Sequence, residues 1–181
     1  EALLPVLHQD EKEAVDIAQQ CLYDIHEEFQ HKYLAMMCAK LGFASVFPQD
    51  EEIIGNLLSI LNAHGIDYTR FFHSLNDPNP MSIWCEYSDL VTWWPKYLER
   101  LELTDKTQID QTCLRQSSNP RFIPRNHIVE ACIAKALNGD CAPVVRLINA
   151  MQHVHDRTPV DEVYFEQSPL KPGQYQTFCG T

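Results

Sequence analysis

Residues 119–137 read NPRFIPRNHIVEACIAKAL, and this stretch holds the most regular amphipathic pattern in the chain. Pro124 suits the first position of a helix, because that position needs no N–H and the proline ring already fixes a helical φ. The apolar residues after it recur at helical spacing and predict one buried face: Ile128, Val129, Cys132, Ile133, Ala136 and Leu137. Gly139 should end this helix in a left-handed conformation. The stretch therefore predicts a well-bounded helix without catalytic chemistry of its own.

A longer pattern of the same kind lies near the N-terminus. Asp10 suits a helix N-cap, Glu13 completes a capping box, and Gly42 is a natural terminator about 31 residues on. A helix of that length exceeds the usual range and would extend for roughly 45 Å. Its apolar series predicts a continuous buried stripe: Ala14, Val15, Ala18, Cys21, Leu22, Ile25, Phe29, Tyr33, Met36, Met37 and Leu41.

Further helices follow to the end of the chain. Asp50 should open one that Gly65 closes, and Asp67 and Asp140 should cap two others. Residues 81–103 predict an aromatic-rich core helix that Pro95 kinks or divides. One face of it is formed by Leu90, Val91, Trp94, Leu98 and Leu101. Residues 104–116 fit either a short helix or a loop. We expect a single all-α domain over residues 1–181, an irregular bundle of about six to eight helices with an extended tail at residues 154–181.

Composition excludes several classes of protein. The chain has 181 residues and a net charge of −11, which disfavours nucleic acid as a partner, and it has no apolar run long enough to cross a membrane. Seven cysteines without a CxxC pair indicate neither a disulfide framework nor a zinc site, so a reducing compartment is expected. Three of them fall on apolar helical faces and should be buried: Cys21, Cys38 and Cys132.

Charge is distributed unevenly along the sequence. Residues 1–67 hold twelve acidic side chains against three lysines, whereas residues 115–146 have a net charge of +3. The two segments either contact each other and solvent, or the basic one docks on an acidic surface outside this chain. Arg121 and Arg125 are either phosphate clamps or pins that fix the start of the helix through carboxylates and carbonyl groups. Asn126 is a poor helix former and should hydrogen-bond to another segment.

Candidate metal and phosphate sites are weak. His26 and His31 are five residues apart, so they diverge around a helix and cannot share a metal ion. His153, His155 and Asp156 would need ligands from elsewhere. The sequence contains neither GxGxxG nor GxxxxGK[ST], and its six glycines form no phosphate-binding loop.

Two blocks, NPRFIPRNH at residues 119–127 and QTFCGT at residues 176–181, resemble the C-terminal end of the selenoprotein O family of kinase-like protein adenylyltransferases. LLPVL at residues 3–7, YLAMMCAKLG at residues 33–42 and DYTRFF at residues 67–72 resemble earlier family segments in the same order. The positions that match the family pattern are Asn119, Pro120, Arg121, Phe122, Arg125, Asn126, Gly139, Asp140 and Cys179.

The resemblance implies a longer parent, a pseudokinase that binds ATP and Mg²⁺ and transfers AMP to Ser, Thr or Tyr hydroxyls of protein substrates. The family's nucleotide- and metal-binding residues precede the equivalent of Leu3, so this chain is expected to be a C-terminal portion without catalytic, cofactor-binding or metal-binding residues. Its partner would be the missing kinase-like N-terminal region. In the family, Cys179 occupies the redox position. The compartment would be cytoplasmic in a bacterium or mitochondrial in a eukaryote. The alternative is a free-standing helical interaction domain without catalysis.

Overall fold

The computed structural model describes residues 3–104, 107–156 and 160–166. Within these residues every regular element is helical and there is no strand, so the predicted all-α fold is confirmed. The elements are α1 (Leu4–Leu7), α2 (Glu11–Leu41), α3 (Asp50–Ala63), α4 (Tyr68–Ser74), α5 (Met81–Trp84), α6 (Ser88–Glu102), α7 (Gln108–Ser118), α8 (Asn126–Leu137), α9 (Ala142–Met151) and the 3₁₀ helix η1 (Glu162–Phe165).

The long helix α2 has the predicted bounds. Asp10 Oδ1 accepts hydrogen bonds from the backbone N–H groups of Lys12 and Glu13, and Gly42 ends the helix with φ of 85°. The predicted capping box is only half formed, because the backbone N–H of Asp10 donates to His8 Nδ1 at 3.1 Å. The Glu13 carboxylate pairs with His8 Nε2 at 3.2 Å instead.

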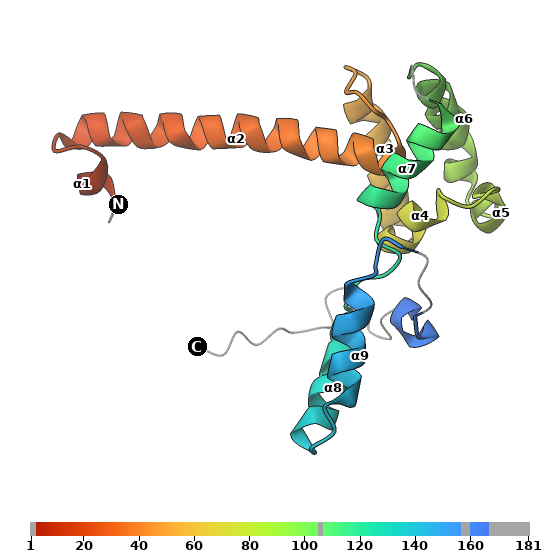
Figure 1. The fold of residues 1–181 in the computed structure, drawn as a ribbon. Coiled ribbons are helices and arrows are strands. Elements are labelled where there is room, and N and C mark those ends of the chain that lie inside the picture. The colour runs from red at the N-terminus through yellow and green to blue at the C-terminus, as the bar shows by residue number, and fades with distance from the viewer. Residues whose placement is uncertain (1–2, 105–106, 157–159, 167–181) are drawn as a thin grey trace.

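Most of α2 projects away from the rest of the molecule (Figure 1). Its buried residues are Ala14 near the start and Met37, Cys38 and Leu41 at the end. The predicted continuous buried stripe is therefore wrong for the middle of the helix. Large apolar side chains there are exposed, at 67% for Leu22, 62% for Ile25 and 60% for Phe29. Cys21 is exposed as well, whereas Cys38 and Cys132 are buried as predicted.

A first hydrophobic core forms where the C-terminal end of α2 meets α3, α4, α5 and α6. Three of its aromatic side chains donate hydrogen bonds to acceptors within the molecule. The Trp84 N–H donates to Ser74 Oγ at 2.8 Å, the Trp93 N–H donates to the Ile53 carbonyl at 2.9 Å, and the Tyr97 hydroxyl donates to the Leu41 carbonyl at 3.0 Å. The aromatic stretch is thus core, as its helical spacing predicts.

The helical break in the aromatic stretch differs from the prediction. The chain is interrupted between Trp84 and Ser88, and Pro95 lies inside α6 without ending it. Pro95 is exposed, so the carbonyl that it leaves without a helical partner, that of Val91, is on the solvent side. The buried face is also rotated from the predicted one and consists of Leu90, Trp93, Tyr97 and Arg100.

A second, smaller core lies between α8, α9 and η1, below the first in Figure 1. Helix α8 begins at Asn126 rather than Pro124, because Arg125 is extended with ψ of 144° and serves as the N-cap residue. Gly139 ends the α8 segment with φ of 89°, and Asp140 Oδ1 accepts from the Ala142 N–H at 3.1 Å at the start of α9. Within the predicted tail, η1 packs the buried Tyr164 against this core.

The polar stretch at residues 104–116, which the sequence allowed to be either a helix or a loop, contains most of α7. Thr107 and Asp110 make a reciprocal capping box at its start. Its buried Arg115 lies against the turn that ends α2, where a Cβ placed on Gly42 would lie 2.8 Å from Arg115 Nη1. Helix α7 therefore packs against the end of α2, and the chain continues from it through Asn119 toward the second core.

Candidate functional site

The block at residues 119–126 runs through the joint between the two cores. Asn119 is 2% exposed and its Nδ2 donates to the Lys40 carbonyl in the last turn of α2 at 2.7 Å. In return, Lys40 Nζ donates to the Ser118 carbonyl at 3.0 Å and to Asn119 Oδ1 at 3.3 Å. Burial lowers the pKa of Lys40. These bonds tie the start of the block to the end of the long helix.

The middle of the block is fixed to the second core. The backbone N–H of Arg121 donates to the Val154 carbonyl at 2.8 Å, and Arg121 Nη1 donates to the Asp156 carbonyl at 3.0 Å. The Phe122 ring is 2% exposed and stacks on Tyr164 with ring centroids 5.4 Å apart.

The end of the block returns to the first core. Arg125 Nη1 pairs with Asp67 Oδ2 at 2.8 Å, and both side chains are 15% exposed. Burial raises the pKa of Asp67, but hydrogen bonds from Arg125 and the Arg70 backbone outweigh it, so the net shift is downward. Because Asp67 also caps α4 through the Arg70 N–H, this carboxylate joins a helix start to the block.

The other predicted site residues are placed as follows. Pro120 is partly buried, directly after Asn119, and Asn126 is the exposed first residue of α8. The hydrogen bond expected from Asn126 to another segment stays a prediction. Cys179 lies outside the described residues.

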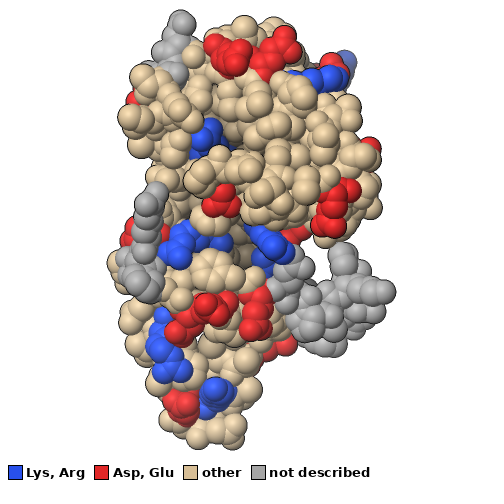
Figure 2. Space-filling model, turned by 90° about the vertical axis from the view of Figure 1, so that its right-hand side faces the viewer, with Lys and Arg blue, Asp and Glu red and all other residues tan. Residues whose placement is uncertain are grey.

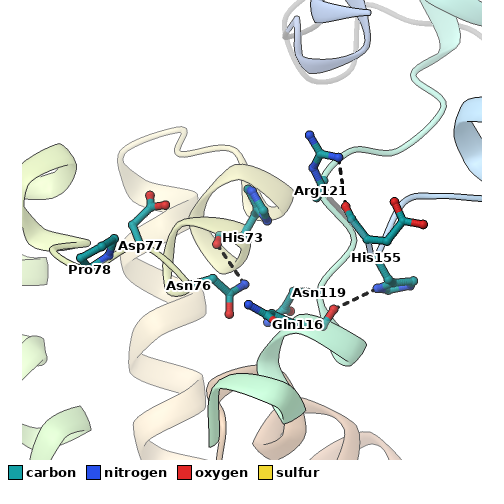
Figure 3. Close-up of a pocket in the computed structure, with 9 residues that line it drawn as sticks. His73, Asn76, Asp77, Pro78, Gln116, Asn119, Arg121 and His155 are labelled. Carbon is teal, nitrogen blue, oxygen red and sulfur yellow. Dashed lines mark hydrogen bonds between the residues drawn. The ribbon is translucent and has the colours of Figure 1, made fainter. Parts of the chain in front are cut away.

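A polar cavity of about 370 Å³ lies beside this block (Figure 3). Three segments far apart in sequence line it: the end of α4 and its following loop, the end of α7 with the block, and the residues after α9. The lining residues are His73, Asn76, Asp77, Pro78, Gln116, Asn119, Arg121, His155 and Asp156. Two of the predicted residues, Asn119 and Arg121, thus share a cavity, whereas Arg125 and Asn126 do not line it.

Some polar atoms of the cavity lining are hydrogen-bonded to one another, and others are not. Asn76 Nδ2 donates to the His73 carbonyl at 3.2 Å, and His155 Nδ1 lies 3.1 Å from the Gln116 carbonyl (Figure 3). His73 Nδ1 and Asn76 Oδ1 are buried without a hydrogen-bond partner. Burial lowers the pKa of His73, and Arg121 lowers it further while Asp77 opposes the shift.

The charges around the joint are mixed in sign. Figure 2 shows basic and acidic side chains interspersed over the middle of the face that it displays. Two arginines of the basic segment at residues 115–146 are engaged within this chain. Arg115 is buried, and Arg125 pairs with Asp67 of the acidic segment. The two charged segments therefore contact each other, which was one of the two expectations.

A buried ion pair in the first core was missed by sequence analysis. Arg100 Nε and Nη2 donate to the Asp50 carboxylate at 2.6 and 2.9 Å, and these side chains are 1% and 0% exposed. The Cys38 thiol also donates to Asp50, at 3.3 Å, and burial together with this carboxylate raises the pKa of Cys38 to about 12. The Arg100 guanidinium lies 4.0 Å from the ring centroid of Phe47. No sequence motif links two residues fifty positions apart.

Of the weak metal candidates, only His153 and Asp156 are in contact among the described residues. His26 and His31 are exposed on α2, and His153 Nδ1 lies 2.7 Å from Asp156 Oδ2. Among the residues that the structure describes, no group of three or more His, Cys, Asp or Glu side chains could hold a metal ion. In the same residues no helix is both long and apolar enough to cross a membrane.

Comparison with known proteins identifies the family. A family model described as protein adenylyltransferase SelO matches residues 4–152. The protein nucleotidyltransferase YdiU of Clostridium botulinum strain Hall is 33% identical over 183 residues, an alignment that covers 100% of this chain and 37% of that relative. The proteins of the same name from Geobacillus kaustophilus and Anoxybacillus flavithermus are 33% and 34% identical over the whole of this chain, and it covers 38% and 37% of their lengths.

The chain thus spans little more than a third of the curated relatives that it matches, in agreement with the expected C-terminal portion. The alignments with these relatives run through the whole chain, including the joint and both cores. Because the family model matches most of its length, this chain belongs to the protein adenylyltransferase SelO family.

Proposed function

We propose that this chain is the C-terminal helical part of a kinase-like protein that transfers AMP from ATP to Ser, Thr or Tyr hydroxyls of other proteins. The observation that carries this proposal is the family match together with its coverage, since the relatives named as nucleotidyltransferases are much longer. Phosphoryl-type transfer needs a phosphate-gripping Lys, a covering loop and a metal-binding Asp or Asn. The kinase-like remainder would supply these groups and bind ATP and Mg²⁺, and the chain described here would brace it.

The experiment compares the 181-residue chain with the longer protein. Each is incubated with Mg²⁺, ATP labelled on the α-phosphate and a generic protein acceptor. We expect label on protein only with the longer form, and an ATP labelled on the γ-phosphate should leave no label. Specific labelling by the 181-residue chain alone would contradict the proposal. A start codon directly before Glu1 would favour the free-standing interaction domain instead.

For the family block we propose a structural role, as the joint that sets the α8–α9 pair against the first core. The contacts of Asn119 with Lys40, of Arg121 with the residues after α9, and of Arg125 with Asp67 support it. In a phosphate clamp both arginines would face one ligand. Arg121 lines the polar cavity and Arg125 does not, which favours the structural role.

For Cys179 we propose a redox role with a partner cysteine in the kinase-like remainder. The support comes from sequence: Cys179 lies in the block QTFCGT, which resembles the family's C-terminal end, at the position where the family carries its redox cysteine. Titration of free thiols in the longer protein, with and without reductant, tests the idea. In the unchanged longer protein we expect two more free thiols with reductant than without it. In Cys179→Ser this difference between the two counts should be smaller by two. An unchanged count removes the redox role without affecting the transferase proposal.

A further inference from the structure

The helices α2 to α9 sort into two bodies. The closely packed helix pairs of the first body are α2 with α3 and α7, α3 with α6, and α5 with α6, whereas α8 packs on α9. Among the described residues, the two hydrophobic clusters have no side chain in common. In Figure 1 the α8–α9 pair extends below the other helices and meets them at the joint. We call α2 to α7 the first body, and α8, α9 and η1 the second body.

The chain passes from one body to the other within three residues. Asn119 belongs to the first body, because it is buried and its Nδ2 donates to the Lys40 carbonyl. Arg121 belongs to the second body, because its backbone N–H donates to the carbonyl of Val154, a member of the second cluster. A hinge needs only a few loop residues that absorb a change in φ and ψ. Rotation at residues 119–121 would therefore move the second body while both cores stay intact.

The contacts that bridge the two bodies are polar. Arg125 Nη1 at the start of α8 pairs with Asp67 Oδ2 at the start of α4, at 2.8 Å. His155 Nδ1, after α9, lies 3.1 Å from the Gln116 carbonyl at the end of α7, and His155 is exposed. The polar cavity lies at the same boundary and takes its walls from both bodies (Figure 3). Two bodies of one chain are expected to move relative to each other unless a large hydrophobic interface holds them.

We propose that the second body swings on residues 119–121, and that the ion pair of Arg125 with Asp67 is the latch that holds it in the position described here. The inference extends the structural role proposed for the family block, because the joint then also allows a second position. Opening the latch would part the walls of the polar cavity, since His73 lies on the first body and Arg121 on the second. It would also displace η1, after which the sequence continues to its C-terminal end.

The experiment measures distances between spin labels in the longer protein by pulsed electron paramagnetic resonance, with the other reactive cysteines replaced by serine. One label pair spans the bodies, at Glu99→Cys on α6 and Leu137→Cys on α8, and both positions are exposed. A second pair lies within the second body, at Leu137→Cys and Val145→Cys on α9, where Val145 is also exposed.

Arg125→Gln removes the latch and leaves the Asp67 carboxylate in place as the cap of α4. We expect this variant to broaden the distance distribution between the bodies by about twofold or more, because little else than polar contacts then restrains the hinge. The distribution within the second body should not change, since the α8–α9 core is untouched.

Arg70→Gln is the matched control. It removes an arginine charge three residues from Asp67, but the Arg70 guanidinium lies over the Trp84 ring of the first body, 5.7 Å from its centroid, so both distributions should stay as they are. Asp67→Asn should broaden the distribution between the bodies as far as Arg125→Gln does, and the double variant no further, because each change breaks the same pair.

Three results overturn the inference. The first is a distribution between the bodies that Arg125→Gln leaves as narrow as before, and the second is equal broadening by Arg70→Gln. The third is broadening within the second body, which would mean that the α8–α9 core comes apart instead of swinging. Because no step reads AMP transfer, each of these results leaves the transferase proposal standing.

Discussion

The buried pair of Asp50 and Arg100 offers the sharpest test of the first core. Asp50→Asn keeps the shape of the side chain but removes the charge that compensates a guanidinium only 1% exposed. Removing one partner of a buried pair costs about 3–5 kcal/mol, and we expect a loss near the lower end, about 3 kcal/mol, because asparagine still accepts hydrogen bonds. Against a total stability of about 5–15 kcal/mol this is a large fraction. In urea unfolding followed by circular dichroism, the midpoint should fall by roughly 1–2 M.

A double variant separates the charge effect from the packing effect. Combining Asp50→Asn with Arg100→Met leaves no buried charge, and the methionine can occupy the space beside Phe47. We expect the double variant to be more stable than Asp50→Asn alone. Strictly additive losses would refute the reasoning, since the two side chains would then act independently. The exposed pair of Glu28 and Lys32 is the control, and Glu28→Gln should leave the midpoint unchanged.

Three further predictions concern the joint and its cavity. Gly42→Ala should cost about 2–4 kcal/mol in urea unfolding, because φ is 85° and the added Cβ meets a side chain, whereas Gly139→Ala, at φ of 89° with open space, should cost only about 1 kcal/mol. Equal losses at the two glycines would contradict the close contact. Asn119→Ala should cost about 2 kcal/mol, because it leaves buried groups in the last turn of α2 unpaired, and a change within error would show that the joint relaxes freely. His73 has its pKa lowered from 6.5 by burial, so the unfolded chain binds the proton more readily. Its contribution to stability is therefore present above pH 6.5 and lost as the pH falls below it; His73→Gln should flatten that part of the stability profile, and an unchanged slope would rule the group out.

Helix boundaries were predictable where a local chemical signal sets them. Asp10, Gly42 and Gly139 act through their own backbone geometry or a bond to the next turn, so the sequence alone locates them. Pro124 shows the limit of such signals. The proline would suit a helix start, yet the ion pair of Arg125 with Asp67 accompanies an extended residue, and the helix begins two positions later.

Buried faces were predicted less well than helix ends: on α8, Ile133 and Leu137 were expected to be buried and are 51% and 84% exposed. In α6 the sequence pattern selects Leu98, but the structure leaves it 42% exposed and buries Arg100 instead. Hydrophobicity cannot anticipate this choice, because Arg100 is stabilised inside by a carboxylate that arrives from α3. The polar cavity was out of reach for the same reason, since its walls come from three separate segments. Of its residues, sequence analysis singled out Asn119 and Arg121 through the family block, and His155 and Asp156 only as weak metal ligands.

The exposed middle of α2 shows that an apolar pattern signals a need for burial without saying what provides it. Periodicity predicted one stripe over the whole helix, and the described part of the chain covers only its two ends. A protein that ended its packing there would expose Leu22, Ile25 and Phe29 in a row at least 60% open to water. Covering a single large apolar side chain contributes about 1.5–3 kcal/mol, so leaving three exposed forgoes several kcal/mol, comparable to the stability of a small domain. Such a helix is better explained as half of an interface than as the edge of a finished fold.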